Sequence, residues 1–266
     1  MRKILKKIHL YLALALCLPL ILQGLTGSMM AFRSEISDAI INYKYDFAKG
    51  EMASQETIIE IARKEVDTDL SLVPFKMPEK KNQAAKVRFS KNGERKPILE
   101  VLLDPVSLKI IEINDPRQNF FRLTKKFHEE LFLSKIGKNI VGIFGIVMLF
   151  MALSGLVLWW PKKGNLKRAL TFKISESGKK FHRDLHGAVG FWFMLPLLAT
   201  SATGIYLIYF KSNRSSKIWH SIHDGSALGT FGETTIFLVG FLPLLFSITG
   251  IALWWLKKKN KMQKFN

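Results

Sequence analysis

Residues 8–32 of this chain read IHLYLALALCLPLILQGLTGSMMAF, and residues 185–210 read LHGAVGFWFMLPLLATSATGIYLIYF. Each stretch is apolar over more than the roughly 20 residues that a helix needs to cross the hydrocarbon core of a bilayer. In each, a proline follows the histidine by ten residues, and the glycine of a Thr-Gly pair follows it by eighteen. The two stretches therefore predict a pair of related transmembrane helices.

Two further apolar stretches, residues 139–160 and 234–256, are also long enough to span a membrane. His128 precedes Gly155 by 27 residues, and the same distance separates His223 from a later glycine. A spacing that recurs in this way indicates an internal repeat. We predict a membrane all-α four-helix bundle made of two duplicated helical hairpins.

The distribution of charged residues indicates how the chain is oriented in the membrane. Of its 266 residues 48% are hydrophobic, and 40 Lys and Arg against 21 Asp and Glu give a formal charge of +19. Four basic residues precede the first span, seven lie in residues 161–181 and five follow residue 256. Because cytoplasmic loops of membrane proteins are rich in Lys and Arg, we expect both termini and the middle loop in the cytoplasm. Nucleic acid is not an expected partner.

The first span is too long for the apolar core of a signal peptide, so we expect an uncleaved helix. The expected protein is multi-pass, with lipid bilayer around its spans. The predicted segments are the first span with its cytoplasmic N-terminus (1–32), a periplasmic domain (33–138), the second span (139–160), a basic cytoplasmic loop (161–184), the third span (185–210), a periplasmic loop (211–233), the fourth span (234–256) and a basic cytoplasmic tail (257–266).

The periplasmic segment, residues 33–138, predicts a small α+β domain between the first two spans. Apolar residues at spacings of three and four predict a helix over residues 56–66. The predicted strands are residues 87–89, 98–103 and 108–113, with a turn at Asn92-Gly93 between the first two. A helix on a short antiparallel sheet is the expected result.

Four histidines occupy equivalent positions of the repeat. His9 and His186 lie near the cytoplasmic face, whereas His128 and His223 lie near the periplasmic face. The single cysteine, Cys17, excludes a multi-cysteine metal site. Two imidazoles from different helices, without a carboxylate or thiol at matching positions, favour axial ligation of haem iron over a zinc site. We therefore predict two haem b groups, one held by each pair.

Several alternatives stay open for these residues. His182 lies one helical turn before His186, and His220 lies three residues before His223, so either is an alternate ligand, although the repeat favours its neighbour. His182, His220 and Arg183 also suit contacts to a haem propionate, or simply the protein surface. A histidine near a membrane interface is often a polar anchor, and the Thr-Gly and Ser-Gly pairs suit ordinary helix packing.

Motifs along nearly the whole chain together resemble the PepSY-associated transmembrane family, which includes iron-regulated inner-membrane proteins and ferric-siderophore reductases of Gram-negative bacteria. The resemblance implies haem ligation by the same four histidines and a PepSY domain at about residues 52–115, although the turn Asp-Pro-Val-Ser-Leu at 104–108 lacks the usual glycine. The motifs are Lys-Ile-His-Leu-Tyr at 7–11, Leu-Thr-Gly at 25–27, Phe-His-Glu-Glu-Leu-Phe-Leu at 127–133, His-Arg-Asp-Leu-His-Gly at 182–187 and Ile-Thr-Gly-Ile-Ala-Leu-Trp-Trp at 248–255.

The resemblance implies an oxidoreductase of the bacterial inner membrane that passes electrons to ferric iron or a ferric chelate at the periplasmic face. No Gly-x-Gly-x-x-Gly follows a strand, so a Rossmann-type nicotinamide site is not predicted, and a quinol, a separate reductase or a small diffusible donor is expected. Lys211, Arg214 and Lys217 suit either attraction of an anionic ferric complex or plain solvation. Catalytic residues, haem potentials and homo-oligomerisation are left open.

Two other classes of function compete with this interpretation. One is a non-redox membrane anchor whose outer domain binds a peptide or a protease. The other is an accessory subunit of a transporter, since duplicated hairpins also occur in transporters. Asp184 and Glu233, at the ends of spans, offer no proton relay for a transporter, and incidental histidines in an anchor would not follow the repeat.

Overall fold

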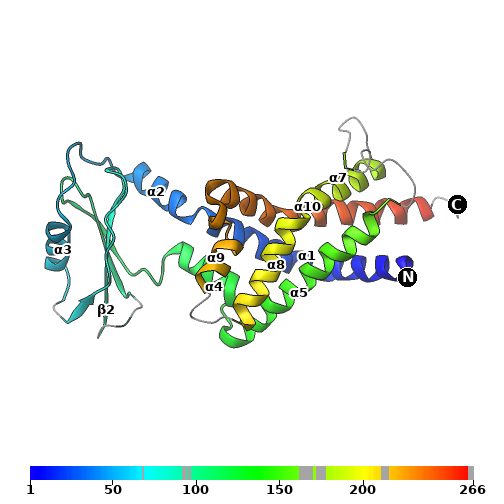
Figure 1. The fold of residues 1–266 in the computed structure, drawn as a ribbon, viewed down its shortest axis with the longest axis horizontal. Helices are drawn as coiled ribbons and strands as arrows, with labels where there is room; N and C mark the ends of the chain where they lie inside the picture. The colour runs from blue at the N-terminus through cyan, green and yellow to red at the C-terminus, as the bar shows by residue number, and fades with distance from the viewer. Residues whose placement is uncertain are drawn as a thin grey trace. The chain divides into compact units, whose positions relative to one another are not determined.

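The computed structural model describes residues 1–67, 69–91, 94, 97–161, 170–171, 178–210 and 216–262. Its fold comprises two compact units, one of residues 1–31 and 125–266 and one of residues 32–124 (Figure 1). The predicted turn at Asn92-Gly93 lies outside the described residues, as do Lys211 and Arg214.

The first unit is helical and has the lengths of a membrane protein. Its elements are α1 (Arg2–Ala31), the end of α4 (Phe120–Glu130), α5 (Ser134–Trp159), α7 (Gly178–Trp192), α8 (Met194–Tyr209), α9 (Ser216–His223), the 3₁₀ turn η1 (Ser226–Leu228) and α10 (Gly229–Met262). Within the described residues, α1, α5 and the helical run that includes α10 are each long and apolar enough to cross a bilayer, and α7 with α8 makes a fourth span if the bent pair counts as one. The predicted membrane bundle is confirmed.

The third span is divided where the sequence predicts one helix over residues 185–210. The structure starts this helix earlier, at Gly178, and bends it by 62° between α7 and α8 at Phe193. Pro196 explains why a break is tolerated there, because proline has no N–H to donate to the carbonyl of Trp192 and its ring crowds that carbonyl. Pro19, at the equivalent repeat position, lies inside the uninterrupted α1, so proline permits the bend without imposing it.

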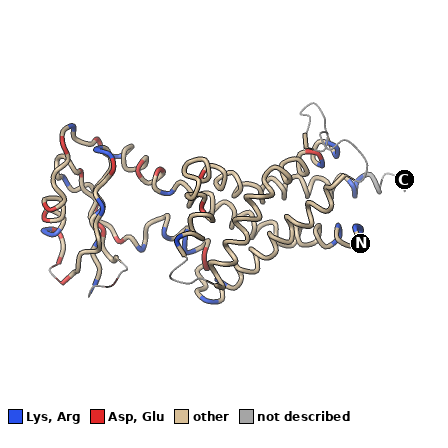
Figure 2. The backbone as a smooth tube through the Cα atoms, viewed as in Figure 1, with Lys and Arg blue, Asp and Glu red and all other residues tan. Residues whose placement is uncertain are grey.

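Small residues bring α1 and α10 together, and these two helices pack side by side (Figure 1). A Cβ atom on Gly24 would collide with the carbonyl oxygen of Gly240, and Ser28 donates a 2.6 Å hydrogen bond to the carbonyl of Phe237. Lipid removes the hydrophobic drive for helix association, so close backbone approach and interhelical hydrogen bonds hold such pairs. Along the long helices of this unit, charged residues lie mainly at the helix ends (Figure 2).

The second unit is an α+β domain. It contains α2 (Arg33–Lys44), α3 (Gln55–Lys64), β1 (Leu70–Leu72), β2 (Ala85–Lys91), β3 (Leu99–Leu103) and β4 (Ile110–Asn114). The strands form an antiparallel sheet in the order β1-β2-β3-β4. The predicted helix and three strands are present within a few residues, whereas β1 and α2 were not predicted. A strand of three residues is too short for its alternation to be read.

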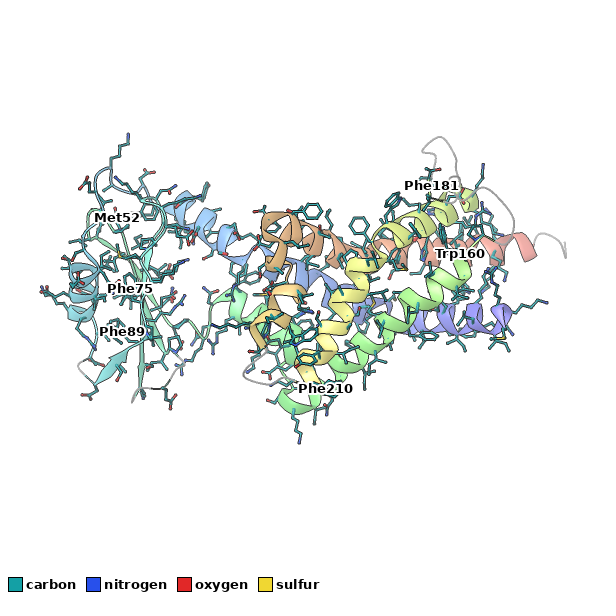
Figure 3. All side chains as sticks on the ribbon, viewed as in Figure 1. Met52, Phe75, Phe89, Trp160, Phe181 and Phe210 are labelled. Atoms are coloured by element: carbon teal, nitrogen blue, oxygen red, sulfur yellow. The ribbon has the colours of Figure 1, made fainter. Side chains whose placement is uncertain are left out.

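The core of this domain lies between α3 and the sheet. Ile58 and Ala62 of α3 are fully buried against Val87 and Phe89 of β2, and Phe75 packs against the same cluster (Figure 3). Buried residues alternate along β2 at Ala85, Val87 and Phe89, as expected for a strand with one face on a core. The helix and its sheet thus stabilise one another by apolar burial.

A buried carboxylate organises the turn between β3 and β4. Asp104 accepts 2.9 Å hydrogen bonds from the backbone N–H groups of Ala48 and Val106 and a 2.7 Å bond from the hydroxyl of Ser107. Burial alone would raise the pKa of Asp104, but these hydrogen bonds together lower it. Leu108, which ends the turn, adopts φ +62°, a conformation that favours glycine.

Candidate functional site

Two of the four repeat-related histidines are hydrogen-bonded to hydroxyl groups of neighbouring long helices. His9 Nδ1 of α1 lies 2.7 Å from Ser154 Oγ of α5. His186 Nδ1 of α7 lies 2.7 Å from Thr249 Oγ1 of α10. In both cases a glycine follows the hydroxyl residue and faces the imidazole. A Cβ on that glycine would lie 3.6 Å from His9 Cε1, or 4.0 Å from His186 Cε1.

The other two histidines repeat the arrangement at the ends of short helices. His128 Nδ1 of α4 lies 3.1 Å from Thr26 Oγ1 and 3.1 Å from the backbone oxygen of Gln23. His223 Nδ1 of α9 lies 3.1 Å from Thr203 Oγ1 and 3.0 Å from the backbone oxygen of Thr200.

The glycines that follow these two threonines are required for the close approach of the rings. A Cβ on Gly27 would lie 3.0 Å from His128 Cε1, and one on Gly204 would lie 3.1 Å from His223 Cε1. Both distances are tighter than ordinary van der Waals contact. Each histidine therefore occupies what we call a hydroxyl-glycine seat, defined as Ser154-Gly155, Thr249-Gly250, Thr26-Gly27 or Thr203-Gly204.

The seats are residues whose role sequence reasoning missed. The sequence left ordinary helix packing open as an explanation of the Ser-Gly and Thr-Gly pairs, whereas the structure places one imidazole against each pair. One helix can provide a histidine for one seat and the seat for another histidine. Thus α1 contributes both His9 and the Thr26-Gly27 seat of His128. The signal was present in the sequence, because all four pairs fall at matching positions of the repeat.

The hydrogen bonds define which ring nitrogen carries the proton. The hydroxyl hydrogen of each seat is already donated to a carbonyl of its own helix, at Met151, Leu245, Leu22 and Ala199. With its hydrogen used there, each hydroxyl oxygen is left to accept from histidine Nδ1–H. The carbonyls of Gln23 and Thr200 can only accept, which assigns this tautomer to His128 and His223. In a neutral ring with its hydrogen on Nδ1, Nε2 keeps a free lone pair.

The structure brings the four histidines together as two pairs. The ring centroids of His128 and His223 lie 6.4 Å apart, and His9 and His186 are close enough for their charges to interact. Among the described residues no group of three or more His, Cys, Asp and Glu side chains is placed to hold a metal ion. A structural zinc site would need four such ligands.

The separation of His128 and His223 fits a metal ion held between their rings. An imidazole nitrogen binds a first-row metal at about 2.0 Å, and bonds of about 1.33 Å place a ring nitrogen about 1.1 Å from the ring centroid. Two imidazoles on opposite sides of one metal then have centroids about 6.3 Å apart. The 6.4 Å between the centroids of His128 and His223 is close to this value in distance.

The local environment keeps this pair neutral. His128 and His223 lie in α4 and α9, outside the long spans. Burial, followed by the proximity of His223, lowers the pKa of His128 to about 4. Burial also lowers the pKa of His223. A metal ligand must be the neutral imidazole, and these rings are neutral at physiological pH.

The two alternate histidines do not occupy the seats. His182 Nδ1 is buried without a hydrogen-bond partner among the described residues, and its ring packs edge-on against Phe181 with centroids 5.6 Å apart. His220 lies near enough to His223 for its charge to act on that ring. The seats at Thr249-Gly250 and Thr203-Gly204 are taken by His186 and His223.

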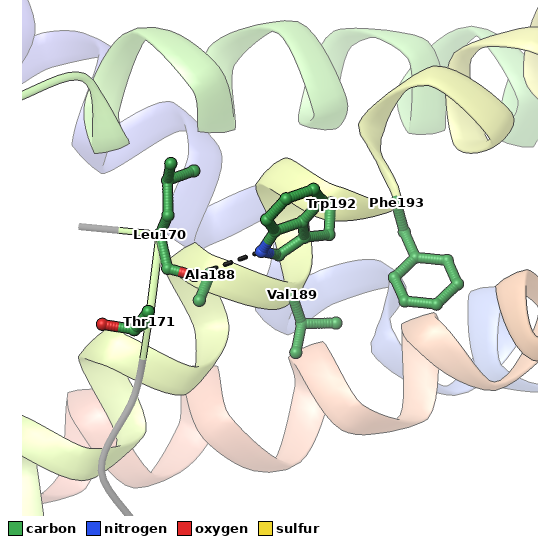
Figure 4. Close-up of a pocket in the computed structure, with 6 residues that line it drawn as sticks. All are labelled: Leu170, Thr171, Ala188, Val189, Trp192 and Phe193. Atoms are coloured by element: carbon green, nitrogen blue, oxygen red, sulfur yellow. Dashed lines mark hydrogen bonds between the residues drawn. The ribbon is translucent and has the colours of Figure 1, made fainter. Parts of the chain in front are cut away.

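A cavity of about 380 Å³ lies at the bend between α7 and α8 (Figure 4). The indole N–H of Trp192 donates a 3.1 Å hydrogen bond to the carbonyl of Leu170 beside it. Among the residues that the structure describes, the lining of this cavity has no ionisable side chain. The lining residues are Leu170, Thr171, Ala188, Val189, Trp192 and Phe193.

The model of a family described as the PepSY-associated TM region matches residues 6–219, which include His9, His128 and His186 and end before His223. No curated protein matches the chain.

Proposed function

Because this chain belongs to the PepSY-associated TM region family, we propose that it is a di-haem b-type electron-transfer protein of the bacterial inner membrane. It reduces ferric iron or a ferric siderophore at the periplasmic face. The observation that carries the proposal is the seating of all four histidines, in two pairs, with Nδ1 of each ring in hydrogen-bond contact with a seat hydroxyl. The four histidines would hold the haem iron, which would supply one-electron transfer when bound.

The hydroxyl-glycine seats orient the histidine rings, as a haem site would require. A hydrogen bond from Nδ1–H fixes the tautomer and the ring orientation of a metal-binding histidine and makes Nε2 more basic. His9 and His186 would hold one haem, and His128 and His223 the other. Because Gly27 and Gly204 have no side chain, the Cε1 atoms of His128 and His223 can lie close to the backbone of the neighbouring helix.

The topology supports one site near each membrane face. His9 lies in the first turns of α1, whereas the seat of His128 lies near the end of the same helix. Lys258 and Lys259 lie over the rings of Trp254 and Trp255 in α10, at 5.7 and 5.6 Å. Tryptophan and basic residues at a helix end are typical of the cytoplasmic interface. We therefore assign the His9–His186 pair to the cytoplasmic side.

An absorption spectrum tests the proposal. Protein purified from haem-sufficient cells should show a Soret band, with split visible bands after reduction by dithionite, and a pyridine haemochrome assay should give two haems per chain. His9→Ala and His128→Ala should each remove one haem. His220→Ala, as the matched control, should leave both. A folded but colourless protein would refute the proposal.

Activity is tested by reoxidation. Protein reduced with a stoichiometric amount of dithionite is mixed with a panel of ferric chelates, and the return of the oxidised spectrum is followed. Reoxidation by ferric complexes at a rate above that with gallium complexes, which accept no electron, supports ferric reduction. Equal rates with both metals would leave a haem protein with a different electron acceptor.

A further inference from the structure

Gln23 is a polar side chain of α1 that the internal repeat does not explain. It is the only Asn or Gln among residues 8–32, residues 185–210 contain none, and the equivalent position of the repeat is Thr200. An amide inside a membrane span is costly unless it is hydrogen-bonded. The Oε1 atom of Gln23 is buried and has no hydrogen-bond partner among the described residues. The reason for an amide at this position must therefore lie with its other end, Nε2.

The amide nitrogen of Gln23 holds the main chain of His128. Nε2 donates a 2.6 Å hydrogen bond to the carbonyl oxygen of His128, and the same nitrogen lies 3.2 Å from Nδ1 of the ring. In the opposite direction, Nδ1 of His128 lies 3.1 Å from the carbonyl oxygen of Gln23. One residue of α1 therefore contacts both the imidazole and the backbone of this histidine.

The bond from Nε2 satisfies a carbonyl group at the end of a helix. The last four carbonyls of an α-helix have no partner within that helix. His128 lies two residues before the end of α4 at Glu130, so its carbonyl is one of these four. A donor from a different helix has to satisfy it, and Gln23 of α1 is that donor.

The two short helices that carry the periplasmic histidines end in different ways. Two residues after His223, Gly225 adopts φ +85°, the left-handed conformation with which glycine commonly ends a helix. Glu130 occupies the equivalent position after His128. There the left-handed conformations fall on Leu131 and Phe132, at φ +49° and +60°. Since residues with a side chain disfavour this conformation, the turn after His128 needs support from outside α4.

The residue at the equivalent position of the second hairpin does not provide such a contact. The hydroxyl group of Thr200 lies 3.0 Å from the carbonyl oxygen of Pro196 and 3.1 Å from that of Leu197, both in its own helix. Only the backbone carbonyl of Thr200 bonds to His223. The side-chain contact of Gln23 is thus a departure from the repeat, confined to the His128 side.

We infer that Gln23 is a positioning residue, which fixes His128 so that its ring is held ready to bind iron. The inference rests on the proposed function, because it concerns the periplasmic haem. It also explains why only one hairpin has the amide. Along α4 the chain passes from the unit of residues 32–124 back to the membrane unit, whereas α9 lies wholly within the membrane unit. A movement of the first unit would pass along α4 to His128 if the end of that helix were not fixed to α1.

Three variants of the full-length protein in lipid nanodiscs test the inference. Gln23→Met keeps the length and approximate volume of the side chain but removes the amide. Gln23→Asn keeps an amide that is one methylene too short to reach the carbonyl of His128, and it serves in the comparison if Gln23→Met does not fold. Gln118→Met makes the same chemical change at an exposed position just before α4 and is the matched control.

Hydrogen exchange followed by mass spectrometry reports on the contact itself and does not require haem. Loss of one hydrogen bond should make residues 127–133 exchange about three- to tenfold faster in Gln23→Met, with no change in residues 216–223. Gln118→Met should exchange like wild type over both segments. Equal exchange of residues 127–133 in wild type and both Gln23 variants overturns the inference.

Carbon monoxide reports on the iron ligand. Ferrous haem with two imidazole ligands offers it no free position, so the reduced wild type should not bind it. Loss of a partner that orients a metal-binding histidine weakens metal binding about 10- to 100-fold. The reduced Gln23→Met protein should therefore bind carbon monoxide at one haem per chain, and a redox titration should show one of two potentials shifted.

A purely structural role for Gln23 predicts a different result. Faster exchange with unchanged carbon monoxide binding and unchanged potentials would overturn the inference, because Gln23 would then support α4 without affecting the iron ligand. Equal effects on both haems would also overturn it. A wild-type protein without haem refutes the proposed function instead, and hydrogen exchange on that protein still shows separately whether Gln23 holds the end of α4.

Discussion

Removing the hydroxyl group of a seat should have different effects in the two pairs. His186 Nδ1 has Thr249 Oγ1 as its one hydrogen-bond acceptor among the described residues, at 2.7 Å. His223 Nδ1 has two acceptors, Thr203 Oγ1 at 3.1 Å and the carbonyl of Thr200 at 3.0 Å. Thr249 and Thr203 are 2% and 4% exposed, so Thr→Val at the two positions makes the same chemical change in equally buried places.

The free energy lost in each variant depends on the hydrogen-bond acceptors that the histidine retains. In Thr249→Val the N–H of His186 is left without a partner, which costs about 1–3 kcal/mol. In Thr203→Val the N–H of His223 still donates to the Thr200 carbonyl, so the cost should stay near 0.5–1 kcal/mol, the net value of a typical hydrogen bond. Loss of the partner that orients a metal-binding histidine lowers metal affinity by about 10- to 100-fold.

Two assays measure the difference. Thermal unfolding of each variant in detergent reports the free energy lost by the protein, and transfer of haem to excess apomyoglobin reports haem affinity. Thr249→Val should release one haem markedly faster than wild type, whereas Thr203→Val should release haem at nearly the wild-type rate. If Thr203→Val is as damaging as Thr249→Val, the backbone carbonyl does not support His223 and the argument about the seats is wrong.

Three further outcomes are expected. Gly27→Ala places a Cβ 3.0 Å from His128 Cε1 and should destabilise the bundle by about 1–3 kcal/mol in thermal unfolding, whereas Gly250→Ala, with 4.0 Å to His186 Cε1, should be tolerated. The pKa of His128 is lowered to about 4 in the folded protein, so the unfolded chain binds a proton at a higher pH than the folded chain does. The free energy of unfolding of the haem-free protein should therefore fall by on the order of 3 kcal/mol between about pH 6.5 and pH 4. A free energy of unfolding that is independent of pH in this window would contradict the burial of that ring. Asp104→Ala leaves the N–H groups of Ala48 and Val106 unpaired and should lower the free energy of unfolding by about 2–4 kcal/mol, measured as faster hydrogen exchange in β3. As a control, Asp115→Ala removes an exposed ion pair with Arg117 and should lower it by less than about 1 kcal/mol.

The sequence predicted the parts of this protein that depend on local or periodic properties. Apolar length identifies a membrane span because the bilayer has a fixed thickness, and residues 8–32 and 139–160 meet that requirement on their own. The repeat spacing singled out His9, His128, His186 and His223, since duplication keeps equivalent residues at equivalent positions. The α3 helix and the strands β2 to β4 were readable from periodicity.

Other features arise only when distant segments pack together. The bend at Phe193 is not set by proline alone, because Pro19 leaves α1 continuous. The seats join residues far apart in the chain, such as His9 with Ser154. The unpartnered His182 nitrogen is visible only once α7 has been packed against its neighbours. Spacing thus singled out four histidines as candidates, whereas packing decided which nitrogen of each ring meets a hydrogen-bond partner, because those partners are supplied by another helix.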